Sequence, residues 1–196
     1  MNEELQTKQK LLESAKADFL EHGFKNASLR RICKNAGVTT GALYFFFKGK
    51  EDIFEAVISE PLAMFEKMFE RLVNTEFTDA KAFDKTEEEM MRFLLRYRSE
   101  VMIILDKSEG TKYEGFKAAY LQTLENVFTR FFKKYLPAPD PQLIHVVTAM
   151  RFYGYLEILY GGHGEDEAVE LAKTVGIYAD AGFAGLIKAM TGVHNG

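Results

Sequence analysis

The chain of 196 residues has a single cysteine, no tryptophan and only four prolines. One cysteine excludes an internal disulfide and is typical of a reducing compartment. No apolar run reaches the roughly 18 residues that a membrane-spanning helix needs, and the first 30 residues do not resemble a signal peptide. We therefore expect a cytoplasmic protein that does not enter a membrane.

Signals for strands and for reactive sites are also missing. No alternating strand patterns appear, and no Asn-Gly or Asp-Gly turn joins two such segments. The four histidines have no metal-ligand spacing with one another. We find no Ser/His/Asp or Cys/His set, no Gly-rich phosphate loop and no credible acidic pair. The sequence thus predicts an all-α protein that is not an enzyme and has no cofactor or metal.

Positive charge is scarce overall, since the net charge is −4. It is distributed unevenly. Residues 1–52 carry nine Lys/Arg and seven Asp/Glu, whereas residues 53–196 carry sixteen and twenty-two. A nucleic acid would therefore be attracted to the first segment and repelled by the second.

Residues 28–47, SLRRICKNAGVTTGALYFFF, have the layout of a helix-turn-helix. Two helices that cross closely need small side chains where they meet, and Cys33 and Ala36 supply them. Gly37 permits the positive φ of a tight turn. Leu29, Ile32 and Leu43 are expected to form the small core.

The ends of both helices have suitable capping residues. Ser28 can cap the first helix, and either Thr39 or Thr40 can cap the second. The second helix then begins with small residues, which let its N-terminus approach base edges and phosphates. Nearby cations would supply the sequence-independent part of the affinity: Arg30, Arg31, Lys34, Lys48 and Lys50. The alternative is an ordinary helical hairpin.

With these residues the sequence resembles the TetR family of bacterial regulators over about residues 8–56. The family pattern is matched by Ser28, Ile32, Cys33, Ala36, Gly37, Val38, Thr39, Gly41, Leu43, Tyr44, Phe46, Phe47 and Lys50. Two positions depart from the pattern. Phe46 replaces the usual Tyr or His, which removes one polar phosphate contact, and Cys33 replaces Ala.

The resemblance implies a role for each residue of the motif. It implies that Ser28, Thr39, Tyr44 and Lys50 hold phosphates and that Phe47 belongs to the core. It further implies that Thr40, Gly41, Ala42 and Phe45 face bases. Together with the cations nearby, the predicted DNA-binding residues are Ser28, Arg31, Thr39, Thr40, Gly41, Ala42, Tyr44, Phe45, Lys48 and Lys50.

Helical spacing continues through the rest of the chain. A first helix over residues 7–22 should end at Gly23, and Pro61 falls inside a long helix over 50–74. Thr86 and Glu89 form a capping box that predicts a helix start, and Asp140 followed by Pro141 predicts another. The further helices are expected over residues 86–105, 113–135, 141–160 and 165–190.

Aromatic residues are abundant, with 17 Phe and 9 Tyr beside 8 Met. Core packing explains most such residues. The family resemblance implies that some of them line a ligand pocket instead, and bundle interiors do host pockets. The candidates are Phe65, Phe69, Phe93, Tyr97, Phe116 and Tyr120. An apolar lining favours a lipophilic or aromatic effector.

Residues 143–160 are apolar on nearly all sides, and residues 165–190 place small residues along one face. A helix of the first kind must be covered on both sides. We expect these two helices to form a homodimer interface, the alternative being a helix interior to one subunit. Arg151 and Glu157 would then pair with the other subunit or face the pocket.

These observations predict two domains. Residues 1–52 would be a three-helix helix-turn-helix DNA-binding domain, and residues 53–196 a helical bundle for ligand binding and dimerisation. The predicted function is a ligand-responsive transcriptional regulator, a repressor released from a palindromic operator by a small effector. The alternative is an all-α ligand carrier or enzyme with an incidental helical hairpin.

Overall fold

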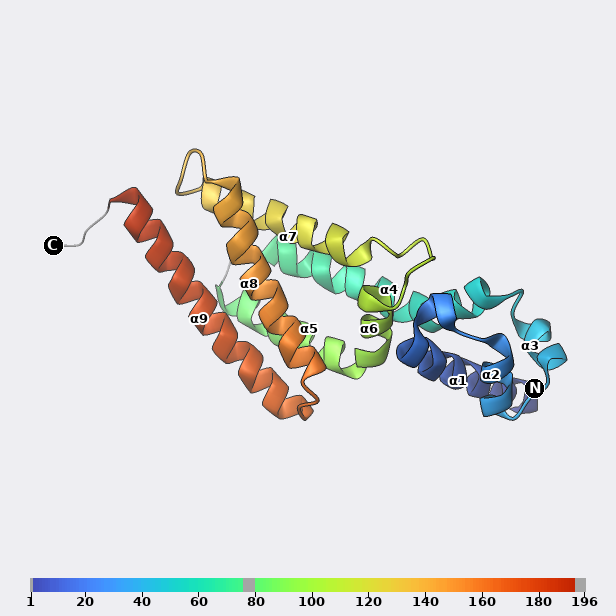
Figure 1. The fold of residues 1–196 in the computed structure, drawn as a ribbon. Coiled ribbons are helices and arrows are strands. Elements are labelled where there is room, and N and C mark those ends of the chain that lie inside the picture. Colours follow the sequence, from blue (N-terminus) through green and yellow to red (C-terminus); the bar gives the residue numbers. More distant parts are fainter. Residues whose placement is uncertain (1, 76–79, 193–196) are drawn as a thin grey trace. The chain divides into compact units, whose positions relative to one another are not determined.

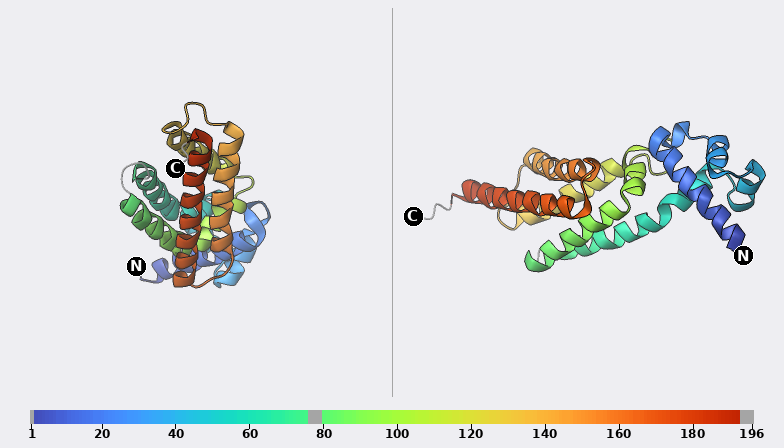
Figure 2. Two further views of the ribbon diagram at one scale, coloured as in Figure 1. Left: turned by 90° about the vertical axis from the view of Figure 1, so that its left-hand side faces the viewer. Right: turned by 90° about the horizontal axis from the view of Figure 1, so that it is seen from below.

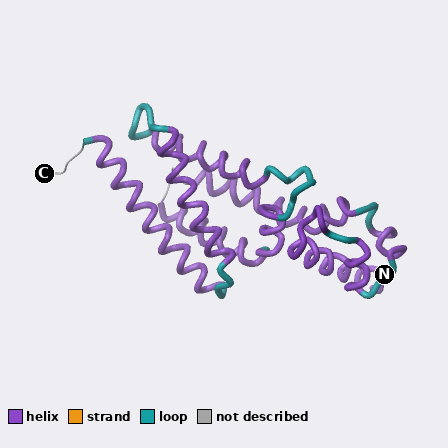
Figure 3. The backbone as a smooth tube through the Cα atoms, viewed as in Figure 1, coloured by secondary structure: helices purple, strands orange, loops and turns teal. Residues whose placement is uncertain are grey.

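The computed structural model describes residues 2–75 and 80–192, and the regular elements within these ranges are all α-helices (Figures 1 and 3). In chain order they are α1 (Asn2–Asn26), α2 (Leu29–Ala36), α3 (Thr40–Phe46), α4 (Lys50–Thr75), α5 (Ala80–Arg96), α6 (Arg98–Asp106), α7 (Phe116–Lys133), α8 (Pro141–Tyr160) and α9 (Glu165–Thr191). The all-α prediction is confirmed. None of the described helices is both long and apolar enough to cross a membrane.

The helices form two compact units. The first unit comprises Met1–Glu66 and Tyr97–Lys117, so α6 packs with the N-terminal helices. The second unit comprises Lys67–Arg96 and Ala118–Gly196. These units are defined by packing, whereas the division predicted after residue 52 is functional, and that division stays a prediction.

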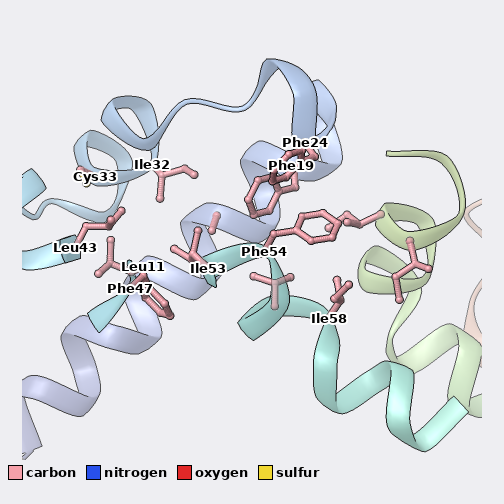
Figure 4. Close-up of a cluster of buried hydrophobic side chains, with 14 of the residues drawn as sticks. Leu11, Phe19, Phe24, Ile32, Cys33, Leu43, Phe47, Ile53, Phe54 and Ile58 are labelled. Carbon is pink, nitrogen blue, oxygen red and sulfur yellow. The ribbon is translucent and has the colours of Figure 1, made fainter. Parts of the chain in front are cut away.

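The core of the first unit is built from aromatic and branched aliphatic side chains (Figure 4). Phe54 of α4 meets both Phe19 and Phe24 of α1 edge to face, with ring centroids 5.0 and 5.2 Å apart. Ile32 of α2 and Leu43 of α3 are fully buried in the same cluster. Burial of each such side chain contributes about 1.5–3 kcal/mol. The two helices of the motif are therefore held on a rigid base.

The second unit has two hydrophobic clusters. One joins α5, α8 and α9 through Met91, Ile158, Ala168, Val169 and Ala172. The other joins α7, α8 and α9 through Phe128, Phe132, Leu136, Ile144 and Phe183. Helices α8 and α9 run antiparallel side by side after the short loop that connects them (Figures 1 and 2).

Several helix boundaries differ from the sequence prediction. Helix α1 begins at Asn2 rather than at residue 7, and α7 spans Phe116–Lys133 rather than residues 113–135. Helix α5 begins at Ala80, so Thr86 lies inside the helix and cannot act as its N-cap. The helix predicted over residues 86–105 is also interrupted at Tyr97, whose φ of −107° and ψ of 29° are not helical. Neither Gly nor Pro marks this break in the sequence.

Other predicted boundaries are confirmed. Gly23 has φ 73° and ψ 162°, which interrupts the regular helix before α1 ends at Asn26. The Asp140 carboxylate accepts a hydrogen bond from the Gln142 amide at 2.9 Å, and α8 spans the predicted residues. Helix α4 continues through Pro61.

Candidate nucleic-acid interface

The turn between α2 and α3 has the geometry that the sequence predicts. The Arg31 amide donates to the Ser28 hydroxyl at 3.4 Å, which caps α2. Gly37 has φ 69° and follows the last residue of α2, a position that favours glycine. The Ala42 amide donates to the Thr39 hydroxyl at 3.1 Å, so Thr39 is the cap of α3.

Helix α3 has one buried face and one exposed face. Leu43 and Phe47, four residues apart, are 0% and 3% exposed and belong to the core. Tyr44 and Phe45, by contrast, are 57% and 72% exposed. Helix α3 therefore presents two adjacent aromatic side chains to solvent, on the side opposite its buried face, and their contact with DNA stays a prediction.

Gly41 lies on the exposed side of the first turn of α3. A Cβ atom added there would meet only the Thr39 Oγ1, at 3.8 Å, which is an ordinary contact. The fold therefore has no need of a glycine at this position. The base contact predicted for Gly41 stays a prediction.

Arg31, predicted to contact DNA, is engaged within the protein. Its guanidinium forms a bidentate pair with the buried Asp18 carboxylate, with Nη2 2.9 Å from Oδ2, and it also donates to the Asn26 carbonyl at 3.2 Å. The Ser28 amide donates to the same carboxylate at 3.0 Å. The hydrogen bond to Asp18 raises the pKa of Arg31. Arg31 thus joins α1 to the start of α2, and its phosphate contact stays a prediction.

Lys50 is also held by backbone groups of the first unit. Its ammonium is 3.2 Å from the Lys25 carbonyl, 3.4 Å from the Ala27 carbonyl and 4.6 Å from the centroid of the Phe24 ring. An ammonium has three N–H donors, so the Lys50 ammonium can still donate one hydrogen bond to a phosphate. The Lys48 side chain is exposed, and its amide donates to the Asp52 carboxylate at 2.8 Å.

The two departures from the family pattern are both accommodated in the core. Cys33 is 3% exposed, and burial raises the pKa of its thiol, while a hydrogen bond with Thr40 opposes that effect. Phe46 is half-buried against the core, with its ring 4.9 Å from that of Phe45. Phe46 therefore replaces a polar contact with packing that supports the exposed Phe45.

Comparison with known proteins agrees with this geometry. Residues 11–57 match the profile of the family described as bacterial regulatory proteins, tetR family. The helix-turn-helix segment of this chain is therefore similar to that of the TetR family. It is 26% identical over 198 residues to the HTH-type transcriptional regulator UidR of Escherichia coli strain K12, covering 95% of this chain and 91% of UidR. It is also 26% identical over 172 residues to the probable HTH-type transcriptional regulator YttP of Bacillus subtilis, covering 79% of each.

Solved structures share the fold. A TetR-like transcriptional regulator from Rhodococcus sp. RHA1 has a TM-score of 0.64 at 17% identity, covering 91% of this chain and 96% of that one. SCO3833 of Streptomyces coelicolor A3 has a TM-score of 0.67 at 16% identity, covering 86% and 88%. The match of residues 11–57 to the tetR family and the similarity to UidR over 95% of the chain indicate a DNA-binding transcriptional regulator rather than an enzyme.

The six residues predicted to bind a ligand fall into two groups. Phe65, Tyr97 and Phe116 belong to the first unit, where the rings of Phe65 and Phe116 are 6.2 Å apart. Phe69, Phe93 and Tyr120 belong to the second, where the rings of Phe69 and Tyr120 are 4.8 Å apart. A pocket lined by all six stays a prediction.

Helix α8 has an inner and an outer apolar face, as its sequence predicts. The outer face consists of Val146, Met150 and Tyr153, which are 52%, 60% and 51% exposed and follow helical spacing. On α9, Ile177 and Tyr178 are 72% and 70% exposed. We call these five residues the α8–α9 patch.

The charged residues of α8 have different surroundings. The Arg151 guanidinium is 3.6 Å from the Asp180 carboxylate of the same chain and 5.7 Å from the Phe128 ring centroid. Glu157 is exposed. Sequence reasoning did not identify the partner of Arg151, nor the buried Asp18 that organises the motif, because both pairings join residues distant along the chain.

Proposed function

We propose that the protein is a dimeric, ligand-responsive repressor that binds a palindromic operator through α3. The observation that carries this proposal is the exposed surface of α3. It presents Thr39, Thr40, Gly41, Tyr44 and Phe45 outward, while the opposite face is fixed in the core.

The residues of this surface have distinct proposed roles. Phosphate contacts position a protein on DNA, whereas contacts to base edges specify the sequence. Ser28, Thr39, Tyr44 and Lys50 are proposed to hold phosphates, and Lys48 supplies an exposed cation at the end of α3. Thr40, Gly41, Ala42 and Phe45 are proposed to face bases, since the exposed Phe45 suits an apolar contact with a thymine methyl group.

A dimer is supported by the α8–α9 patch. Five large apolar side chains exposed on two adjacent helices form a surface that a second copy would cover. Gly182 lies exposed on α9, and a Cβ atom added there would meet nothing within 4 Å in the chain. Two-fold symmetry of the protein would match a palindrome with half-sites about 10 base pairs apart.

Ligand response is supported by the aromatic side chains of both units. A lipophilic or aromatic effector that prefers one arrangement of the helices would shift the protein toward it, and preference for the arrangement that does not bind DNA would release the operator. Occupation of an operator blocks transcription without any further contact, which is why we infer a repressor.

The proposed roles on α3 are tested with two substitutions. Tyr44→Phe should weaken binding to every duplex alike, by roughly three- to tenfold, because it removes one phosphate hydrogen bond. Thr40→Ala should instead change base preference. Tyr135→Phe, at an exposed tyrosine of the second unit, is the matched control and should change neither.

Affinities are measured by fluorescence anisotropy on duplexes selected from a random pool, at fixed salt. A Tyr44→Phe protein with altered sequence preference and unchanged overall affinity would contradict the assignment of Tyr44 to a phosphate.

The dimer is tested with Gly182→Arg. The long cation would enter the space between two copies but would clash with nothing inside one chain. Sedimentation should then show monomers with unchanged helical content. Gly115→Arg is the control, because a Cβ atom there also meets nothing within 4 Å. A Gly182→Arg protein that is still dimeric at low micromolar concentration would place the interface elsewhere.

A further inference from the structure

Thr148, in the middle of α8, has a fully buried side chain whose hydroxyl lacks a hydrogen-bond partner among the residues that the structure describes. A buried hydroxyl without a partner is destabilising, since it has lost its bonds to water. Native structures contain few such groups, and each requires an explanation.

The missing bond is not forced by the helix. A hydroxyl inside a helix can donate to the carbonyl four residues earlier. Four threonines in the described helices do so, at oxygen–oxygen distances of 2.8 or 2.9 Å: Thr7, Thr123, Thr174 and Thr191. Thr148 does not form this bond, so its hydroxyl is available to a group from outside the helix.

Thr148 lies between the two hydrophobic clusters of the second unit. Ile144 and Val147, just before it, pack into the cluster with α7 and α9. Tyr155 and Ile158, further along α8, pack into the cluster with α5 and α9. Thr148 is thus a fully buried polar residue on a stretch of α8 between these apolar side chains.

Aromatic rings from three helices extend along this part of the unit. Phe152, one turn after Thr148, has its ring 5.7 Å from that of Tyr120 on α7. The Tyr120 ring is in turn 4.8 Å from that of Phe69 on α4. Thr148 and Phe152, four residues apart, lie on the same face of α8. A buried hydroxyl beside aromatic surface is a common composition of a small-molecule site.

We propose that the Thr148 hydroxyl is the hydrogen-bonding anchor of an effector site inside the second unit, and that the effector is an uncharged aromatic molecule with one hydroxyl or carbonyl group. This inference rests on the proposed ligand response. A hydroxyl both donates and accepts but cannot neutralise a charge. Arg151, the cation nearest along α8, is already beside Asp180. Both facts favour an uncharged polar group.

The test uses two probes of the same shape, 2-naphthol and naphthalene. The chain contains no tryptophan, so the fluorescence anisotropy of the naphthyl ring reports binding directly. The wild-type protein should bind 2-naphthol about five- to tenfold more tightly than naphthalene, the usual effect of one buried hydrogen bond. Thr148→Val should abolish that preference, whereas Thr148→Ser should retain it.

Thr123→Val is the matched control, because the Thr123 hydroxyl bonds the Ala119 carbonyl at 2.9 Å and lies exposed on α7. It should leave the preference unchanged. Thr148→Val should also raise Tm, by roughly 2–4 °C, because it removes a buried hydroxyl that has no partner in the free protein.

Three results would overturn the proposal: a lower Tm for Thr148→Val, an undiminished preference for 2-naphthol in that variant, or no binding of either probe to the wild-type protein. The affinity of wild-type protein for selected operator DNA is measured alongside. If the wild-type protein does not bind DNA, the proposed repressor function is refuted instead. The two failures are therefore distinguishable.

Discussion

Replacement of Gly41 by alanine separates what the fold requires from what DNA requires. The added Cβ atom would lie 3.8 Å from the Thr39 hydroxyl oxygen and meet no other atom within 4 Å. Alanine also has the higher helix propensity, by up to about 1 kcal/mol in a helix interior and less in a first turn. We therefore expect Gly41→Ala to be at least as stable as the wild type, with a Tm unchanged or raised by about 1–2 °C.

The expected effect on DNA binding has the opposite sign. If the first turn of α3 lies against base edges, a methyl group there pushes the helix away from the groove. Loss of one well-formed base contact corresponds to about 1–3 kcal/mol, or a roughly five- to 150-fold weaker complex. The assay pairs thermal unfolding with anisotropy titration of a selected operator duplex on the same sample.

A stable Gly41→Ala protein that binds the operator as tightly as the wild type would refute this reasoning, because Gly41 could not then lie at the DNA surface. A strongly destabilised variant would contradict the inference that the free protein tolerates a methyl group at this position.

Three further outcomes are expected. Phe45→Ala should reduce the preference for thymine over deoxyuridine at one operator position, since the exposed ring is proposed to contact the thymine methyl; equal discrimination by both proteins would exclude that contact. Asp18→Ala should lower the free energy of unfolding, measured by urea titration, by about 2–4 kcal/mol, because it leaves Arg31 without its carboxylate. A change below about 0.5 kcal/mol, which is typical of a surface substitution, would contradict this prediction. Cys33 should react with thiol reagents only as the protein unfolds, because burial raises its pKa and hides the sulfur, and rapid labelling of the native protein would disprove it.

Features with a local signal were predictable from the sequence. The caps at Ser28 and Asp140 and the left-handed Gly37 depend on a side chain and the backbone within three residues of it. The all-α fold and the outer apolar face of α8 depend on periodicity, which is also read directly from the chain. The same short-range rules predicted the helix-turn-helix, since its layout depends on small residues, a turn glycine and caps at fixed spacing.

Features that depend on distant contacts were not predictable. The break at Tyr97 has no Gly or Pro to mark it, and the early start of α5 overrides a plausible capping box at Thr86. Asp18 reads as an ordinary acidic residue of an amphipathic helix until its pairing with Arg31, 13 residues later, is seen. The unpartnered Thr148 hydroxyl is likewise invisible without its surroundings, because other threonines in helices of this chain do form the local bond.

We propose that a symmetric dimer binds DNA through two copies of α3, one from each subunit. The most direct measurement is selection of duplexes from a random pool by the wild-type protein, followed by sequencing. We expect enrichment of sequences with two-fold symmetry and half-site centres about 10 base pairs, or a multiple of that, apart. No enrichment over the starting pool, or enrichment of single asymmetric sites, would contradict it.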